Sequence, residues 1–250
     1  MFTGLVESFV FQPTRRLDWT PANAALAYED VGLTTSDRVR IHAWWVPAAA
    51  DDAPVLLFCH GNAGNIGDRV YNVKLLHDAG IAVLIFDYRG YGRSEGKPTE
   101  AGAYRDALAG WEWLVRERGI PASRVSLFGR SLGGAVAIEL ATRVEPHRLV
   151  IESTFTSVAD MAAVAMPVVP RALVPRLFDS IGKVGRVRCP VLVLHGTEDE
   201  LVPFAMGQQL FDACHAPKRF VPIEGAGHND TVDVGGRSYI ETIRSFVSEP

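Results

Sequence analysis

Six short, mostly apolar runs alternate with segments of helical pattern over the last four fifths of the chain. The runs cover residues 55–59, 81–86, 125–128, 149–151, 191–194 and 219–223. A strand that is apolar on both faces is buried on both faces, which is typical of a parallel sheet covered by helices. The alternation therefore predicts an α/β fold with a doubly wound, mostly parallel sheet.

Capping signals mark the helices expected between these runs. Gly80 follows a helical pattern over 70–79, and Thr99 precedes one over 100–118 that ends before Gly119, which suits the preference for glycine after a helix and threonine before one. Further helices are expected over 132–143, 204–214 and 239–247. Ahead of them, the alternating segments 27–34 and 39–46 predict an antiparallel hairpin with one exposed face.

The length of 250 residues, with 48% hydrophobic and 22% charged side chains, is enough for one sizeable core. We expect a single domain over 1–250. Residues 156–188 depart from the alternation and contain several prolines. We interpret this insertion as a short helical lid over the active-site edge, because loops at the carboxyl ends of strands carry function. A packed excursion that only covers the sheet is the alternative.

Charge and cysteine content narrow the partners and the compartment. The net charge is −4 and no basic patch is evident, which argues against a nucleic-acid partner. Cys59, Cys189 and Cys214 are odd in number and far apart, so a disulfide framework is not expected and a reducing, cytoplasmic location is favoured. We expect a monomer or a small homo-oligomer.

The apolar residues 1–11 are interrupted by Glu7. They are far fewer than the roughly 20 residues that a membrane span requires, and they lack the basic start of a signal peptide. No transmembrane segment is expected, although a weak peripheral contact of this segment with a membrane surface remains an alternative.

Residues 129–134 read Gly-Arg-Ser-Leu-Gly-Gly and lie between a strand-like run and a helical pattern. A serine on a tight strand-to-helix turn has its hydroxyl exposed above the sheet, and the crowded backbone requires very small residues two positions before and after it. Gly129 and Gly133 meet that requirement. The motif indicates Ser131 as a nucleophile.

A serine hydroxyl needs a base, usually a histidine that a carboxylate orients. In this architecture serine, acid and histidine follow one another along the chain. Asp199 follows the run 191–194, and His228 lies in a glycine-bounded loop after the last run. We expect these two residues to complete a triad with Ser131. Glu198 and Glu200 are neighbouring acids that could be confused with Asp199. The alternative role for Asp199 is a carboxylate at a helix N-terminus, and for His228 a packed or surface histidine.

An oxyanion site is expected beside the serine. The first buried run is followed by His60-Gly61-Asn62, and a backbone N–H from such a loop acts together with the N–H of the residue after the nucleophile. We assign the backbone N–H groups of Asn62 and Leu132 to this role, with a simple strand-end turn as the alternative.

The substrate is expected to contact Tyr88, Arg130, Phe155 and Met161, which follow predicted strands or lie in the predicted lid. Two further arginines in the segment 87–94, Arg89 and Arg93, could hold a substrate carboxylate or phosphate. An ion pair that fixes the loop is the alternative for them.

Four blocks together, residues 60–65, 87–94, 129–134 and the Asp199 and His228 segments, resemble the α/β-hydrolase superfamily in the expected order. The similarity spans about residues 28–247 and is nearest to single-domain serine hydrolases of the monoacylglycerol-lipase-like, depalmitoylase-like and serine-aminopeptidase-like groups. It implies the α/β-hydrolase fold. Relatives in these groups often carry Asp-Gly in the first hairpin, where this chain has Asp37-Arg38.

We expect a serine hydrolase, a carboxylesterase or lipase-like enzyme that cleaves an ester or thioester of a small or acyl-chain substrate through an acyl-enzyme on Ser131. Amide, peptide or carbon–carbon bond hydrolysis with the same triad is the first alternative. A non-catalytic binding protein is the second. The chemistry requires no metal and no cofactor, and no P-loop or dinucleotide fingerprint is present in the sequence.

Overall fold

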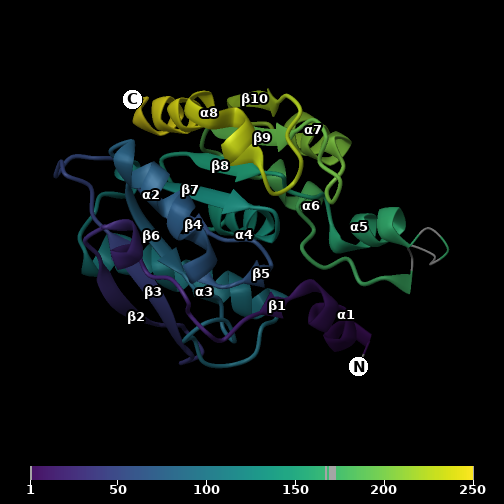
Figure 1. The fold of residues 1–250 in the computed structure, drawn as a ribbon. Coiled ribbons are helices and arrows are strands. Elements are labelled where there is room, and N and C mark those ends of the chain that lie inside the picture. Colours follow the sequence, from purple (N-terminus) through teal and green to yellow (C-terminus); the bar gives the residue numbers. More distant parts are fainter. Residues whose placement is uncertain (1, 167, 169–172, 250) are drawn as a thin grey trace.

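The computed structural model describes residues 2–166, 168 and 173–249. An eight-stranded sheet runs through the molecule in the order β10-β9-β8-β7-β4-β6-β3-β2 (Figure 1). Its strands are β2 (Glu29–Thr34), β3 (Arg40–Val46), β4 (Val55–Cys59), β6 (Ala82–Phe86), β7 (Val125–Arg130), β8 (Leu149–Glu152), β9 (Val191–Gly196) and β10 (Lys218–Ile223). All neighbours are parallel except the β2–β3 and β3–β6 pairs. This arrangement confirms the predicted fold class.

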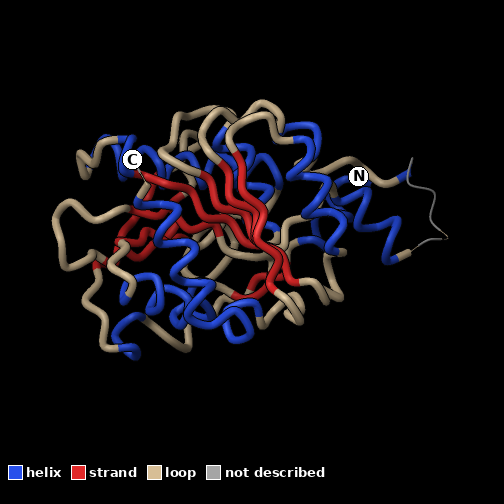
Figure 2. The backbone as a smooth tube through the Cα atoms, turned by 90° about the horizontal axis from the view of Figure 1, so that it is seen from above, coloured by secondary structure: helices blue, strands red, loops and turns tan. Residues whose placement is uncertain are grey.

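The sheet is covered on both faces by helices, as Figure 2 shows. The helices are α1 (Phe2–Val10), α2 (Val70–Asp78), α3 (Glu100–Glu112), α4 (Leu132–Ala141), α5 (Val158–Ala165), α6 (Ile181–Val184), α7 (Phe204–Ala213) and α8 (Thr231–Ser248). Alternate residues of the central strands enter two separate cores. Leu56 and Phe58 pack with α2 and α8, whereas Leu57 and Cys59 pack with α3 and α4. Burial on both faces is what the continuous apolar runs predicted.

Short one-turn elements complete the architecture. They are the 3₁₀ turns Pro21–Ala24, Ile66–Arg69 and Ala122–Arg124, the π-helical turn Trp113–Glu117, and a separate parallel pair of β1 (Gln12–Pro13) and β5 (Ala63–Gly64). Thr99 caps α3 by accepting a hydrogen bond from the Gly102 N–H. The π-helical turn continues α3 to Glu117, close to the predicted end of this helix.

The last helix begins earlier than the sequence predicts. The pattern indicated a helix over 239–247, but α8 begins at Thr231 and contains one non-helical residue, Gly236, with φ 51°. Two helical pieces therefore join at a kink. Glycine adopts this conformation at little steric cost, so Gly236 allows a bend within the helix.

Helix α1 and helix α5 lie side by side at one end of the molecule (Figure 1). Helix α5 opens the predicted lid segment 156–188, of which residues 167 and 169–172 lie outside the described residues. Ser157 caps α5 by accepting a hydrogen bond from the Asp160 N–H. Within the described residues, no helix combines the length and the apolar character needed to cross a membrane.

Candidate active site

Ser131 occupies the turn between β7 and α4 with φ 54° and ψ −120°. This left-handed backbone conformation is uncommon for a residue with a side chain and marks a strained turn. The turn is tightly packed, since a Cβ on Gly133 would lie 1.9 Å from the Cys59 carbonyl oxygen and one on Gly129 would lie 2.3 Å from the Gly133 carbonyl oxygen. The two glycines are therefore required by close backbone approach, as the motif predicted.

A continuous chain of hydrogen bonds joins the three residues that the sequence singled out. His228 Nε2 lies 3.1 Å from Ser131 Oγ, and His228 Nδ1 lies 2.8 Å from Asp199 Oδ2. These contacts bring together the ends of β7 and β9 and the loop that follows β10. Both bonds have the length expected of a nucleophile, its base and the carboxylate that orients the base.

The Asp199 carboxylate is buried and held by several donors. Its Oδ1 accepts hydrogen bonds from the backbone N–H groups of Leu201, at 3.0 Å, and Val202, at 2.7 Å. Burial acts to raise the pKa of Asp199, but the hydrogen bonds from His195 and His228 outweigh it and hold the pKa well below its ordinary range. Asp199 is therefore a permanent anion at neutral pH, suited to orient a histidine and to stabilise its charged form.

The loop that carries His228 is attached to the sheet through the ion pair of Arg130 and Glu152, which the sequence did not indicate. Arg130 Nη2 donates to the His228 carbonyl oxygen at 2.7 Å, and Arg130 Nε lies 3.1 Å from Glu152 Oε1. Glu152 is fully buried at the end of β8 and also accepts hydrogen bonds from the hydroxyls of Thr231 and Tyr239. The strand carrying the serine and the loop carrying the histidine are thus fixed to each other.

The loop assigned to the oxyanion site is braced by its side-chain and carbonyl groups. The Asn62 side-chain amide donates to the Val10 carbonyl oxygen at 3.0 Å. The backbone carbonyl oxygen of Asn62 accepts a hydrogen bond from the Tyr91 hydroxyl at 2.6 Å. Among the described residues, neither the Asn62 nor the Leu132 backbone N–H has a hydrogen-bond partner. Both donors therefore remain available to a ligand.

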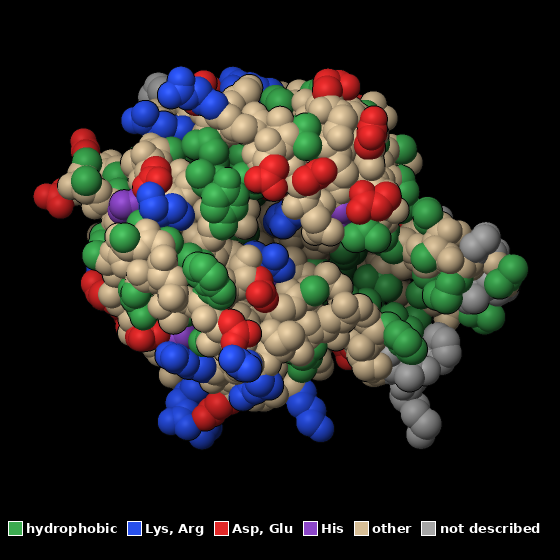
Figure 3. All heavy atoms as spheres, viewed as in Figure 1, with side chains coloured by type: hydrophobic (Ala, Val, Ile, Leu, Met, Phe, Trp, Pro, Cys, Tyr) green, Lys and Arg blue, Asp and Glu red, His purple; other side chains and the backbone are tan. Residues whose placement is uncertain are grey.

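A cavity of about 720 Å³ opens above Ser131. Its lining residues are Val10, Gln12, Gly61, Asn62, Ala63, Arg69, Arg130, Ser131, Leu132, Phe155, Val158, Met161, Val164, Ala165, Glu200, Leu201, Val202, His228 and Asn229. Figure 3 shows a hollow on this face with hydrophobic, basic, acidic and histidine side chains around it. Arg130, Phe155 and Met161, which we expected to contact substrate, line this cavity. The volume is in the range of a small-molecule pocket.

Tyr88 does not line the cavity, which corrects the prediction that it contacts substrate. It is fully buried, and its hydroxyl donates to the His60 carbonyl oxygen at 3.0 Å. Tyr88 therefore supports the loop that carries Asn62 from behind. Its position directly after a buried strand suggested the rim of the pocket, but the ring points into the core beneath it.

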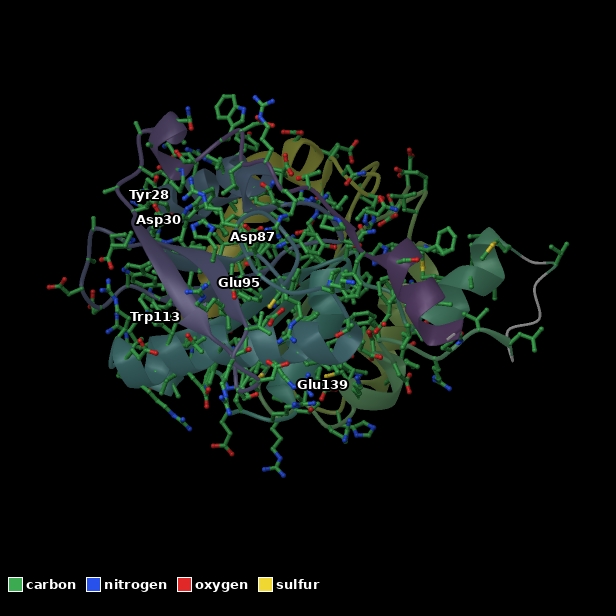
Figure 4. All side chains as sticks on the ribbon, turned by 90° about the horizontal axis from the view of Figure 1, so that it is seen from below. Tyr28, Asp30, Asp87, Glu95, Trp113 and Glu139 are labelled. Atoms are coloured by element: carbon green, nitrogen blue, oxygen red, sulfur yellow. The ribbon has the colours of Figure 1, made fainter. Side chains whose placement is uncertain are left out.

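The other two arginines considered for anion binding are engaged elsewhere. Arg89 pairs with Asp106 at 2.9 Å and with Asp37 at 2.8 Å, and its side chain is buried. Arg93 lies 3.5 Å from Asp30, which stands beside Tyr28 at the β2 edge of the sheet (Figure 4). The structure favours the ion-pair interpretation for both. Asp37, in the hairpin turn where this sequence differs from its relatives, therefore forms an ion pair with Arg89.

Sequence reasoning missed two residues of the site, Arg69 and Glu152, and considered Glu200 only as an acid that could be confused with Asp199. Glu200 accepts a hydrogen bond from the His228 N–H at 3.0 Å. The sequence signal for Glu200 was its position next to Asp199. The signal for Glu152 was its position directly after an apolar run. Among the described residues, no group of three or more histidine, cysteine or acidic side chains is arranged to hold a metal ion.

Comparison with known proteins places these features in a family. A family model described as serine aminopeptidase, S33, matches residues 50–182. An uncharacterised protein of Mycobacterium tuberculosis is 39% identical over 98% of this chain and 90% of its own length. The human alpha/beta hydrolase domain-containing protein 17B is 35% identical over 94% of this chain and 81% of its own length.

A solved structure supports the same fold. A Pyrococcus furiosus esterase has a TM-score of 0.81 and 23% sequence identity, and the match covers 95% of this chain and 97% of that chain. With the sequence relatives and the strand order, these findings show that the chain belongs to the α/β-hydrolase family and is a hydrolase.

Proposed function

We propose that this hydrolase cleaves carboxylic esters or thioesters through a covalent acyl-enzyme on Ser131. The observation that carries the proposal is the continuous hydrogen-bonded chain from Asp199 through His228 to Ser131, which ends at the floor of the cavity. In the proposed mechanism each of these residues has a separate task.

Ser131 Oγ attacks the acyl carbonyl carbon while His228 Nε2 takes the hydroxyl proton. The Asn62 and Leu132 N–H groups donate to the oxygen that becomes negative. His228 then gives the proton to the leaving oxygen or sulfur, and the acyl group stays on Ser131. Water, deprotonated by His228, attacks the acyl-enzyme and releases the acid. Asp199 keeps the imidazole oriented and stabilises its charged form.

The cavity supports an apolar acyl group. Phe155 and the side chains of α5 that face the cavity, among them Val158 and Met161, form one apolar wall. We propose that residues 1–250 act as one domain in which the segment 156–188 is a lid that sets acyl-chain preference. The unpaired thiols of Cys59, Cys189 and Cys214 support a reducing compartment such as the cytoplasm.

A substrate series tests the proposal. The wild-type protein, Ser131→Ala and the control Ser238→Ala, an exposed serine on α8, are assayed with p-nitrophenyl esters from acetyl to dodecanoyl and with the matching p-nitroanilides. We expect ester hydrolysis by the wild type and the control and none by Ser131→Ala. Equal turnover by Ser131→Ala would refute the nucleophile, and a preference for anilides would favour the aminopeptidase-like alternative.

A further inference from the structure

Arg69 is a cation of the cavity wall that forms no ion pair with the residues that the structure describes. It ends the 3₁₀ turn Ile66–Arg69 and lines the cavity that opens above Ser131. Its Nη2 donates to the Ala63 carbonyl oxygen at 2.8 Å. In the described part of the chain, no carboxylate oxygen lies within 4.0 Å of its guanidinium, and its buried Nε has no hydrogen-bond partner.

The other arginine of the cavity is different. Arg130 is neutralised by Glu152, at 3.1 Å, and occupied by the His228 carbonyl oxygen, at 2.7 Å. Glu200, the acidic residue among the described lining residues, is held by the His228 N–H at 3.0 Å. The cavity therefore has one arginine committed to the structure and one with most of its five N–H donors uncommitted.

The electrostatic surroundings of Arg69 are unfavourable to its charge. Burial and then the neighbouring Arg130 lower the pKa of Arg69, and they outweigh the more distant carboxylates of Asp68 and Glu152, which act to raise it. The Arg69 charge acts in turn on the loop beside Ser131, because burial and then Arg69 lower the pKa of His60 to about 3. A partly desolvated cation that forms no ion pair costs free energy, and a ligand that brings a negative charge would offset this cost.

The position of Arg69 assigns that charge to one side of the substrate. Arg69 directly precedes α2 and bonds to the Ala63 carbonyl oxygen, whereas the apolar lining residues Val158 and Met161 belong to α5. The apolar wall contributed by α5 is suited to the acyl chain. The part of the cavity at Arg69, next to the loop of Asn62 and Ala63, is then left for the leaving group.

We infer that Arg69 recognises a carboxylate or phosphate on the leaving group, so that the substrates are acyl esters or thioesters of anionic alcohols or thiols. The inference rests on the proposed function. In the reaction the acyl carbon bonds to Ser131 Oγ, the bond to the leaving oxygen or sulfur breaks, and His228 supplies that atom with its proton. Arg69 holds the anionic group by charge-assisted hydrogen bonds, for which the guanidinium fork is suited.

Matched substrates with one acyl group test this inference. The butanoyl ester of 4-hydroxybenzoate carries a carboxylate, the butanoyl ester of 4-hydroxyphenyl phosphate carries a phosphate, and the butanoyl ester of methyl 4-hydroxybenzoate is neutral. We expect Arg69→Gln to lower kcat/KM for the anionic esters about 10- to 100-fold and to change the neutral ester less than about threefold. Whichever of the carboxylate and phosphate esters shows the larger loss of kcat/KM identifies the preferred anion.

Two further variants make the result specific. Arg69→Lys keeps the charge but lacks the guanidinium fork, so it should retain part of the preference for anionic esters that Arg69→Gln loses. If Arg69→Gln does not fold, Arg69→Lys is compared with the wild type in its place. Arg237→Gln removes an arginine whose side chain is 90% exposed on α8 and should leave all three rates unchanged. Free 4-hydroxybenzoate should inhibit neutral-ester hydrolysis by the wild type, with an inhibition constant at least tenfold higher in Arg69→Gln, as a lost charged hydrogen bond implies at about 1.4 kcal/mol per tenfold.

The possible failures are distinguishable. An equal loss on neutral and anionic esters would mean that Arg69 only braces the Ala63 loop, and unchanged rates in Arg69→Gln would mean that it binds no anion. Either result overturns the inference while ester hydrolysis stands. A wild-type protein that hydrolyses none of the three esters, or a Ser131→Ala variant that hydrolyses them all, overturns the proposed function and the inference with it.

Discussion

Replacement of Glu152 by glutamine should destabilise the protein far more than a change of one atom suggests. Glu152 is fully buried and faces Arg130, whose side chain is only 10% exposed. Glu152→Gln removes the negative charge and leaves the guanidinium buried without a counter-ion. The hydroxyls of Thr231 and Tyr239 also exchange a carboxylate for a weaker amide partner.

The magnitude follows from the burial of the pair. Removal of one partner from a buried ion pair costs about 3–5 kcal/mol, because the remaining charge is desolvated and unpaired. For a chain of this length each kcal/mol lowers the melting temperature by about 2–4 °C. We therefore expect Glu152→Gln to melt roughly 6–20 °C below the wild type.

The assay is a double-mutant cycle by urea unfolding, with Glu152→Gln, Arg130→Met and the double variant. Since the double variant contains no unpaired charge, it should be more stable than Glu152→Gln by about 1 kcal/mol or more. Its hydrolytic rate should still be reduced, because the His228 carbonyl has lost the donor that holds its loop.

Two results would refute this reasoning. One is a cost below about 1 kcal/mol for Glu152→Gln, the range of an exposed pair. The other is a double variant whose loss of stability equals the sum of the two single losses, since independent effects show no coupling between the charges.

Gly133→Ala should abolish soluble expression or ester hydrolysis, because its Cβ would lie 1.9 Å from the Cys59 carbonyl oxygen. The control Gly32→Ala has open space around its Cβ and should be near neutral. Equal behaviour of the two variants in expression and activity would contradict the close packing of the turn. Met161→Ala removes side-chain volume from the apolar wall, so it enlarges the cavity and should shift the kcat/KM optimum to longer acyl chains; an unchanged chain-length profile would remove Met161 from the acyl site. The pKa of Asp199 is depressed by its hydrogen bonds despite burial, so its carboxylate stabilises the fold above the unfolded pKa of about 3.9 and loses this effect as pH falls towards the folded pKa. The gap in melting temperature between wild type and Asp199→Asn should thus narrow below about pH 4, and a gap that is constant with pH would count against this linkage.

Much of the fold could be predicted from local pattern. The central strands are buried on both faces, so their apolar runs end within two residues of the observed strands, as at 191–194 against β9 (Val191–Gly196). Chain order was enough to select Ser131, Asp199 and His228, because parallel strands bring their carboxyl ends to one edge of the sheet.

The partners of individual side chains could not be predicted in this way. Glu152 meets a hydroxyl 79 residues away and another 87 residues away, and no local signal encodes such contacts. Tyr88 and Arg89 lie at the expected edge of the sheet, but the direction of each side chain depends on the elements packed around it. Arg69 lies four residues after the block 60–65, to which the sequence assigned only a backbone role, so its charge was overlooked.

The most direct test of the central claim, that Ser131 forms the covalent intermediate, is to locate a fluorophosphonate adduct by peptide mass spectrometry. The account predicts one adduct, on the peptide that contains Ser131, which is absent in Ser131→Ala and forms much more slowly in His228→Ala. Undiminished labelling of Ser131→Ala, or a stoichiometric adduct on another residue of the wild type, would contradict it.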